Sequence, residues 1–231
     1  MRINKCTRLF NALLVLQIII AVPFAGGVFG QVKTEEQPKT PEQTKTTTQV
    51  KVQAAQVNNF IQRFDDKFLI NLALKRNDDE TKTMLFLSNS LGYVSYSIPV
   101  ALMVGGIVRH DVQMRQNALY VGSSAAITLG ATLLMKAVFK RRRPFVQNLK
   151  IVAVYNAGST SFPSGHTSTS FAVATALSRA YPKWYVIVPS YLWASSVGYS
   201  RMYLGVHYPS DVFGGALLGS TTSLLLRPAI K

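Results

Sequence analysis

Three short blocks of this sequence carry the residue types that bind a phosphoryl group and break its bond. They lie at residues 136–144, 161–166 and 200–211. A phosphoryl group in transfer spreads negative charge over three equatorial oxygens, so its catalysts mainly position it and stabilise that charge. The blocks together hold three cations, two histidines, a Ser-Gly pair and one aspartate: Lys136, Arg143, Arg201, His166, His207, Ser164, Gly165 and Asp211.

The cations and the Ser-Gly pair are the candidate phosphate-binding groups. Lys136, Arg143 and Arg201 supply positive charge, and an arginine fork can bind two oxygens at once. The run that follows the Ser-Gly pair predicts a helix with Ser164 near its N-terminus. We therefore expect the N–H groups of Ser164 and Gly165 to face an anion at the positive end of the helix dipole. Gly165 has no Cβ and would let the oxygens approach the backbone closely.

The two histidines are expected to divide the proton chemistry with one carboxylate. His207 precedes Asp211 by four residues, and a carboxylate that accepts its Nδ1–H would leave Nε2 free to attack phosphorus. His166 would protonate the leaving oxygen and then activate water. Because the cations already neutralise the phosphate, we expect the site to need no metal ion and no other cofactor.

The three spacings together resemble a known signature. K-x6-R-P, P-S-G-H and S-R-x5-H-x3-D, in this order, are similar to the motifs of the type-2 phosphatidic acid phosphatase family. That family includes membrane lipid phosphatases, class A acid phosphatases and vanadium haloperoxidases, and the motifs cover about a third of this chain. The resemblance implies an all-helical bundle and a phosphohistidine intermediate. It also implies catalytic roles for His207, His166 and Asp211, and phosphate-binding roles for Lys136, Arg143, Ser164, Gly165 and Arg201.

Each block also has a simpler interpretation. The run K-R-R-R at residues 140–143, beside an apolar segment, is typical of a cluster at a lipid surface. A P-S-G-H sequence alone is an ordinary helix start. His110 stands alone on an apolar segment, and we interpret it as a satisfied core residue. The agreement of three independent spacings favours catalysis for the other two histidines.

The N-terminal part of the chain is expected to lie outside the catalytic domain. Residues 1–30 combine a basic start, a long apolar core and small residues near Gly30, which predicts a secretory signal peptide or an uncleaved membrane anchor. Residues 31–57 are rich in Lys, Glu, Thr, Gln and Pro and lack aromatic residues, which predicts a flexible linker. Residues 58–231 would then form a membrane phosphatase domain. Cys6 is interpreted as a bystander thiol.

The remainder of the chain predicts an all-α, polytopic membrane protein. From Phe60, apolar residues recur every three to four positions, which indicates an amphipathic helix. Long apolar runs follow, and a span needs about 20 residues to cross ~30 Å of hydrocarbon. We expect about five core transmembrane helices after the N-terminal segment, at residues 84–108, 117–139, 167–177, 184–199 and 212–226.

The order of the spans predicts one location for the three blocks. If the chain starts in the cytoplasm, alternating spans deliver every block to the periplasmic side of a bacterial inner membrane. Residues 140–143 oppose this orientation, because the positive-inside rule would place their charges in the cytoplasm. Two of the motif cations, however, have a phosphate to bind, and the predicted cytoplasmic segments keep cations of their own: Arg109, Arg115, Arg179, Lys183, Arg227 and Lys231.

The composition of the chain favours some classes of binding partner over others. The net charge is +15, and only Asp111 and Asp211 among the acidic residues follow residue 83. A basic chain can bind nucleic acid, but the apolar runs between its charges favour a membrane and an anionic phospholipid or lipid-phosphate substrate. No nucleic acid and no obligate protein partner is inferred.

The leading hypothesis is therefore a metal-independent lipid phosphatase. Lipid A phosphate or undecaprenyl diphosphate is the favoured substrate, because an outward site meets them, with phosphatidylglycerophosphate and phosphatidic acid as alternatives. The main competing hypothesis is a soluble periplasmic acid phosphatase of the class A type. The uncharged run at residues 119–134 argues against it, since a soluble helix needs a polar face. A non-enzymatic protein that binds lipid headgroups is the third hypothesis.

Overall fold

The computed structural model describes residues 59–158 and 160–226 of this chain. The chain divides into two compact units, Met1–Phe64 and Asp65–Lys231, and the second contains all three blocks. The signal or anchor segment predicted at 1–30 and the linker predicted at 31–57 lie outside the described residues and stay predictions. The predicted domain at 58–231 is described except for its first residue, residue 159 and its last five.

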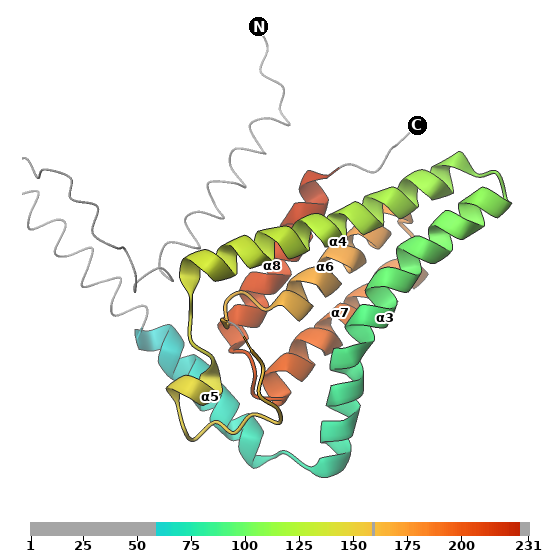
Figure 1. The fold of residues 1–231 in the computed structure, drawn as a ribbon. Helices are drawn as coiled ribbons and strands as arrows, with labels where there is room; N and C mark the ends of the chain where they lie inside the picture. The colour runs from blue at the N-terminus through green and yellow to red at the C-terminus, as the bar shows by residue number, and fades with distance from the viewer. Residues whose placement is uncertain (1–58, 159, 227–231) are drawn as a thin grey trace, which may run out of the picture. The chain divides into compact units, whose positions relative to one another are not determined.

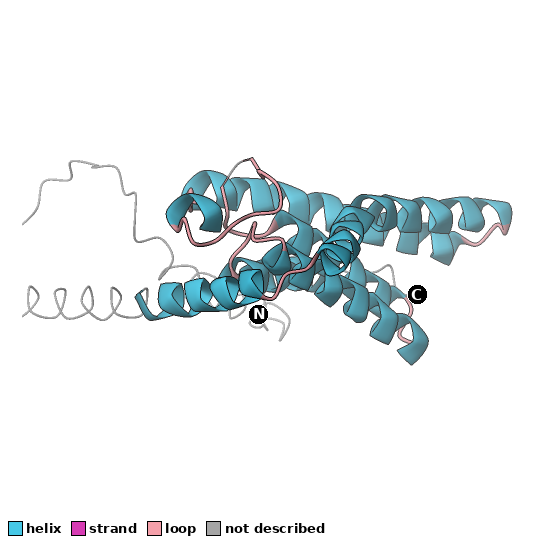
Figure 2. Ribbon diagram, turned by 90° about the horizontal axis from the view of Figure 1, so that it is seen from below, coloured by secondary structure: helices cyan, strands magenta, loops and turns pink. Residues whose placement is uncertain are grey.

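Helices and loops make up the described part of the chain, in which no strand occurs (Figure 2). In the second unit, residues 65–74 are helical. The named helices then follow in chain order (Figure 1): α3 Asp78–Val108, α4 Val112–Phe139, α5 Pro144–Gln147, α6 Gly165–Ala180, α7 Trp184–Tyr203 and α8 Pro209–Leu225. The expected all-α fold is confirmed, and each predicted apolar run falls within a long helix except for the last residue of the run at 212–226.

Polar side chains cap the N-termini of α3 and α4. Asn77 caps α3 by accepting a hydrogen bond of 2.8 Å from the Glu80 amide, and Asp111 caps α4 by accepting one of 3.0 Å from the Met114 amide. Such caps satisfy amides that a helix leaves unpaired at its start. His110 stands directly before this cap, is exposed, and has a φ of 53°. The interpretation of His110 as a core residue is therefore wrong, because the turn points it away from the packed helices.

α3 buries small residues and exposes large apolar ones. Its buried residues are Ser88, Ser95 and Gly106, whereas Tyr93 and Val100 are well over half exposed. A soluble protein would place the apolar side chains inside. Small residues at helix contacts and apolar side chains outside are the pattern of helices packed in lipid.

Two helices in the described residues are long and apolar enough to cross a membrane: Asp78–Val108, and the stretch Val112–Gln147 that begins with α4. A core helix of a soluble protein can pass the same test of length and composition, but most of its residues would be buried. Only a minority of the residues in these two helices are buried. Their exposure indicates helices that face lipid.

α6 is the central helix of the second unit. It packs most extensively on α8, and also on α7 and α4. The contact with α8 is close because glycines of α8 face the backbone of α6. A Cβ added to Gly215 would lie 2.8 Å from the Ser164 carbonyl oxygen, and one added to Gly219 only 2.0 Å from the Ser168 carbonyl oxygen. The glycines thus bring the first turns of α6 and α8 together, and both turns carry residues of the predicted site.

Replacing Gly219 with alanine should therefore destabilise the fold by about 1–3 kcal/mol, the usual cost of overpacking, because the added methyl meets backbone that cannot rotate away. Gly130→Ala is the matched control, since nothing lies within 4 Å of its added Cβ, and it should be neutral or slightly stabilising. Thermal unfolding of both variants in the same detergent measures the difference. Equal unfolding temperatures would show that α6 and α8 do not approach so closely.

Candidate active site

The ends of helices and the connections between them carry all eight predicted site residues. They come from the last turn of α4, the N-cap of α5, the start of α6, the last turn of α7, the α7–α8 connection and the first turn of α8, in this order: Lys136, Arg143, Ser164 with Gly165 and His166, Arg201, His207, and Asp211. The structure brings these segments, far apart in sequence, to one location.

His207 is buried at the centre of the site, with only 2% of its surface exposed. Its Nε2 lies 3.2 Å from Nη1 of Arg143. A guanidinium can only donate hydrogen bonds, so Nε2 must accept and the proton of the neutral ring belongs on Nδ1. This tautomer directs the Nε2 lone pair at a cation that was predicted to bind phosphate.

The other ring nitrogen of His207 faces Asp211. The distance from Nδ1 to Oδ2 of Asp211 is 3.6 Å, which is longer than a hydrogen bond, and Nδ1 has no other hydrogen-bond partner in the described part of the chain. The expected pairing of His207 with Asp211 is thus present as a close approach of opposite charges rather than as a formed hydrogen bond.

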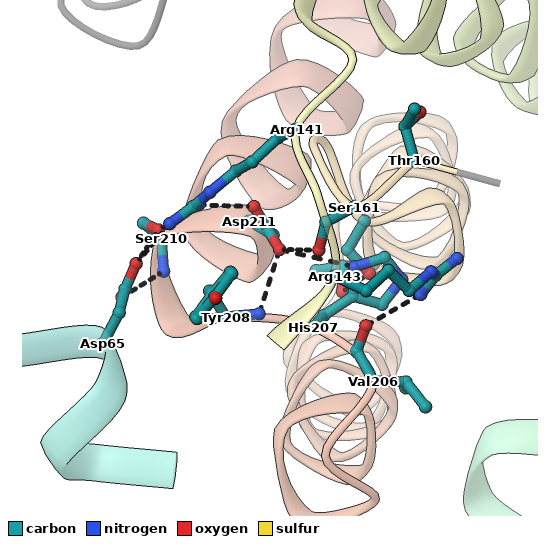
Figure 3. Close-up of polar contacts among 12 residues, drawn as sticks. Asp65, Arg141, Arg143, Thr160, Ser161, Val206, His207, Tyr208, Ser210 and Asp211 are labelled. Atoms are coloured by element: carbon teal, nitrogen blue, oxygen red, sulfur yellow. Dashed lines mark hydrogen bonds and ion pairs between the residues drawn. The ribbon is translucent and has the colours of Figure 1, made fainter. Parts of the chain in front are cut away.

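Asp211 is completely buried, and three donors hold its carboxylate. Oδ1 accepts from Nη1 of Arg141 at 2.7 Å, and Oδ2 accepts from the Ser161 hydroxyl and from the Tyr208 amide at 2.9 Å. Figure 3 shows these donors converging on the carboxylate from separate segments. No role was predicted for Arg141 or Ser161, although both stand within the blocks at residues 136–144 and 161–166.

The three predicted phosphate-binding cations are each anchored by neutral acceptors. Lys136 donates to the Thr160 carbonyl. Arg143 donates to the carbonyl oxygens of Val206 and Gly158, both at 2.7 Å. These carbonyls hold two positive groups together without neutralising them, so their charge stays available to an anion.

Arg201 is the third cation, and it is almost fully buried. Its Nη1 donates to the hydroxyl groups of Ser88 and Tyr155, while its Nε has no hydrogen-bond partner among the described residues. Ser88 lies on α3 and Tyr155 in the loop before α6. Neither was predicted, because nothing in their local sequence marks them as neighbours of Arg201.

Ser164 differs from the prediction. Its amide donates to the backbone carbonyl of Asp211 at 3.1 Å, and its hydroxyl accepts from the Thr167 hydroxyl at 2.9 Å. The expectation that the Ser164 N–H faces an anion is therefore wrong in this structure, because α8 lies close enough to take that donor. For Gly165 the expectation stays a prediction. Its added Cβ would meet protein atoms only at an ordinary 3.6 Å.

His166 is half-buried in the first turn of α6. It interacts electrostatically with the cations and the histidine of the other two blocks: Arg201, His207, Arg143 and Lys136. His166 belongs to α6 through its backbone, whereas its side chain makes no hydrogen bond to a described residue, so its ring nitrogens are not committed to the fold. It therefore lies beside the cations, as the prediction requires, and its role in proton transfer stays a prediction.

Burial is the main cause that lowers the pKa of His207 to about 3; the positive charges of Arg201 and Arg143 act in the same direction, and Asp211 opposes them. The ring is then neutral at physiological pH, and Nε2 carries no proton and accepts from Arg143. Among the described residues, no group of three or more His, Cys, Asp or Glu side chains could hold a metal ion.

Comparison with known proteins gives a consistent result. Residues 117–230 match the model of the PAP2 superfamily. The chain is 31% identical to YbjG of Escherichia coli over 135 residues, and 31% identical to the undecaprenyl-diphosphatase BcrC of Bacillus subtilis over 108 residues. It is 37% identical to the lipid A 4'-phosphatase of Bacteroides thetaiotaomicron over 76 residues. These matches cover 58%, 47% and 33% of this chain, and 66%, 55% and 34% of the relatives.

Two solved structures share the fold. Aquifex aeolicus LpxE superposes with a TM-score of 0.59 at 23% identity, covering 70% of this chain and 93% of that one. A transmembrane PAP2-type phosphatidylglycerolphosphate phosphatase from Bacillus subtilis superposes with a TM-score of 0.61 at 22% identity, covering 93% of this chain and 92% of that one. At these identities the likeness concerns the fold alone. It agrees with the helices of α3 to α8.

The lowered pKa of His207 predicts a pH-dependent stability. Between pH about 3 and 6.5 the unfolded state binds a proton that the folded state excludes, so stability falls as the pH falls through this window. From pH 6.5 to 5 the loss should reach about 2 kcal/mol, at 1.36 kcal/mol per pKa unit. His207→Gln, whose side chain cannot be charged, should lose correspondingly less in thermal unfolding over the same range.

His110→Gln is the matched control for that measurement, because it makes the same substitution at an exposed histidine. Its stability should follow the wild-type pH dependence. A His207→Gln variant that follows the wild type as well would show that burial does not keep His207 neutral.

Proposed function

This chain belongs to the PAP2 superfamily through residues 117–230, and from that premise we propose that it is a membrane-bound phosphatase acting on a phosphate ester or anhydride of a lipid. One observation carries the proposal. Arg143 donates towards Nε2 of a buried, neutral His207, so a nucleophilic lone pair and a phosphate-binding cation face the same point. The named activities of two relatives, an undecaprenyl-diphosphatase and a lipid A 4'-phosphatase, support the substrate class.

The reaction begins with His207 as the nucleophile. Its Nε2 forms a bond to phosphorus while the bond from phosphorus to the leaving oxygen breaks, and His166 gives that oxygen a proton. The negative charge of Asp211, close to Nδ1, stabilises the cationic phosphohistidine. Lys136, Arg143 and Arg201 hold the three equatorial oxygens.

Water completes the cycle. His166, now without its proton, accepts one from a water molecule, whose oxygen attacks phosphorus as the bond to Nε2 breaks. Inorganic phosphate leaves, and both histidines return to their starting states. No step requires a metal ion, since three cations supply the charge that a metal would contribute.

The membrane arrangement follows from the order of the helices. We assign α3, α4, α6, α7 and α8 as five spans, after an N-terminal signal or anchor segment in residues 1–30. The turns at 109–111 and 181–183 then share the cytoplasmic side, where Arg109 and Lys183 satisfy the positive-inside rule. The opposite ends carry the site, which would face the periplasm of a bacterial inner membrane. The exposed apolar surface of α3 supports spanning helices over a soluble acid phosphatase.

Within the lipid phosphates, lipid A phosphate and undecaprenyl diphosphate are the favoured substrates. The names of relatives support both, and an outward site would meet both. Phosphatidylglycerophosphate and phosphatidic acid remain the alternatives, the former being named for one structural neighbour.

Phosphate release by the purified protein in detergent tests this function. The wild type should release phosphate from a panel of these four lipids, retain activity in EDTA, and be inhibited by vanadate, which mimics the phosphoryl transition state. Loss of activity in EDTA, restored by Mg²⁺, would overturn the metal-free mechanism. If the protein hydrolyses a soluble aryl phosphate but none of the four lipid phosphates, a general acid phosphatase is favoured instead.

Substitution of the two histidines separates their roles. His207→Ala should abolish turnover of every substrate and leave no phosphoenzyme, because each substrate needs the attacking nitrogen. His166→Ala should slow lipid hydrolysis by about 10²–10⁴-fold, the usual contribution of general acid–base catalysis. Its defect should shrink on an aryl phosphate, whose leaving group departs without a proton.

The same experiment has an outcome that reverses the assignment. If labelled phosphate is recovered on His166, or if both variants respond alike to the pKa of the leaving group, His166 is the nucleophile. His110→Ala serves as the control, since this exposed histidine lies in the α3–α4 turn and should retain wild-type rates.

A further inference from the structure

We propose that Asp65 and Arg141 are positioning residues that fix the carboxylate of Asp211 for its work on His207; this inference rests on the function proposed above. Asp65 lies in the helical segment before α3, outside residues 117–230 that match the superfamily. Arg141 lies in the connection between α4 and α5. Arg141 occupies one of the unspecified positions of K-x6-R-P, and Asp65 lies outside all three motifs.

The contacts form a continuous chain of alternating charges. Nη2 of Arg141 lies 2.9 Å from Oδ2 of Asp65, and Nη1 of Arg141 lies 2.7 Å from Oδ1 of Asp211. The guanidinium also lies over the ring of Tyr208, 4.1 Å from its centroid. The guanidinium of Arg141 is thus bound by a carboxylate at each of its two Nη atoms and by an aromatic ring on one face. Figure 3 shows it between the two carboxylates.

Ser210 ties the same chain to the start of α8. Its amide donates to Oδ1 of Asp65 at 3.1 Å, and its hydroxyl is in contact with Oδ2 of Asp65 and with Nη1 of Arg141 at 2.8 Å. Asp65 therefore accepts the amide of the residue directly before Asp211, at the positive end of the α8 dipole. It holds the first turn of α8 as well as Arg141.

Burial makes these contacts consequential. The side chains of Asp65 and Asp211 are 1% and 0% exposed, and that of Arg141 is 14% exposed. Charges so far from water depend on their partners, and removal of one partner leaves the other uncompensated. Arg142, the next residue in the same basic run, is exposed. Only one of these two adjacent arginines is built into the site.

The orientation of Asp211 is what the chain controls. Arg141 occupies Oδ1, so Oδ2 is the oxygen left to face Nδ1 of His207. Without Arg141 the carboxylate could rotate, and the stabilisation of a cationic phosphohistidine would weaken. Asp65 supplies the second requirement. Its negative charge balances Arg141, so that the guanidinium does not cancel the charge of Asp211 on which His207 depends.

The test compares Asp65→Asn and Arg141→Gln with two exposed controls, Asp79→Asn and Arg142→Gln. Loss of the hydrogen-bond partner of a metal ligand typically costs about 10–100-fold in activity, and we expect a loss of the same order for the partners of Asp211. The first two variants should lose kcat to this extent with little change in KM or in inhibition by inorganic phosphate, because the phosphate-binding cations are intact. The controls should keep wild-type kcat. Arg141→Lys, which keeps the charge, should recover part of the loss.

Two readouts separate positioning from a general structural defect. The losses should be equal on lipid and aryl phosphates, since forming the phosphohistidine is common to both. Asp65→Asn should also cost less than about twofold when Asp211 is already asparagine, because residues that act through one group are not additive. Full additivity in that background would overturn the proposal.

Ser210→Ala covers the case in which the charge variants fold poorly, because it removes hydroxyl contacts to both residues and no charge. It should lower kcat in the same substrate-independent way, and wild-type kcat in this variant would count against the proposal. An active wild type whose Asp65→Asn variant matches Asp79→Asn overturns this inference alone. A wild type that releases no phosphate from any substrate overturns the proposed function and this inference with it.

Discussion

The site depends on how the buried charge of Asp211 is satisfied. Its carboxylate binds Arg141, Ser161 and the Tyr208 amide, and its backbone carbonyl accepts from the Ser164 amide. These partners come from four separate segments, so one residue in the first turn of α8 links the α4–α5 connection, the loop before α6, the start of α6 and the α7–α8 connection. An ionised carboxylate away from water demands such partners. Meeting that demand also assembles the residues that surround His207.

A second constraint on the site is that three positive charges lie close together. Lys136, Arg143 and Arg201 lie close enough for their charges to interact, and like charges repel. The fold holds them with carbonyl and hydroxyl acceptors rather than with carboxylates. Neutral acceptors fix the position of a cation and leave its charge in place. The cluster therefore suits the phosphate-binding role proposed for it, because a bound phosphoryl group would relieve the repulsion among the three cations.

The helices position this site by packing through small residues. Gly215 and Gly219 allow α8 to touch the backbone of α6, while large apolar side chains of α3 point outward. This arrangement, with small residues inside and large apolar ones outside, is typical of a protein in apolar surroundings. There, burying a large side chain stabilises the fold little, and close contact between backbones stabilises it more. The same close contact consumes the Ser164 amide, which the sequence alone had assigned to a bound anion.

The sequence by itself determined the helical class, the helical runs to within a few residues, and the eight motif residues that gather at the site, because periodicity and spacing are local properties. It did not determine which residue of the basic run turns inward. Arg141 binds Asp211 and Asp65 while Arg142 is exposed, and the two have the same side chain. Nor did it place His110 outside, or pair Asp65 with Ser210 across the chain. These outcomes depend on the path of the connections and on which helix ends meet. A buried charge needs a partner, and the helix ends that meet decide which partner lies within reach.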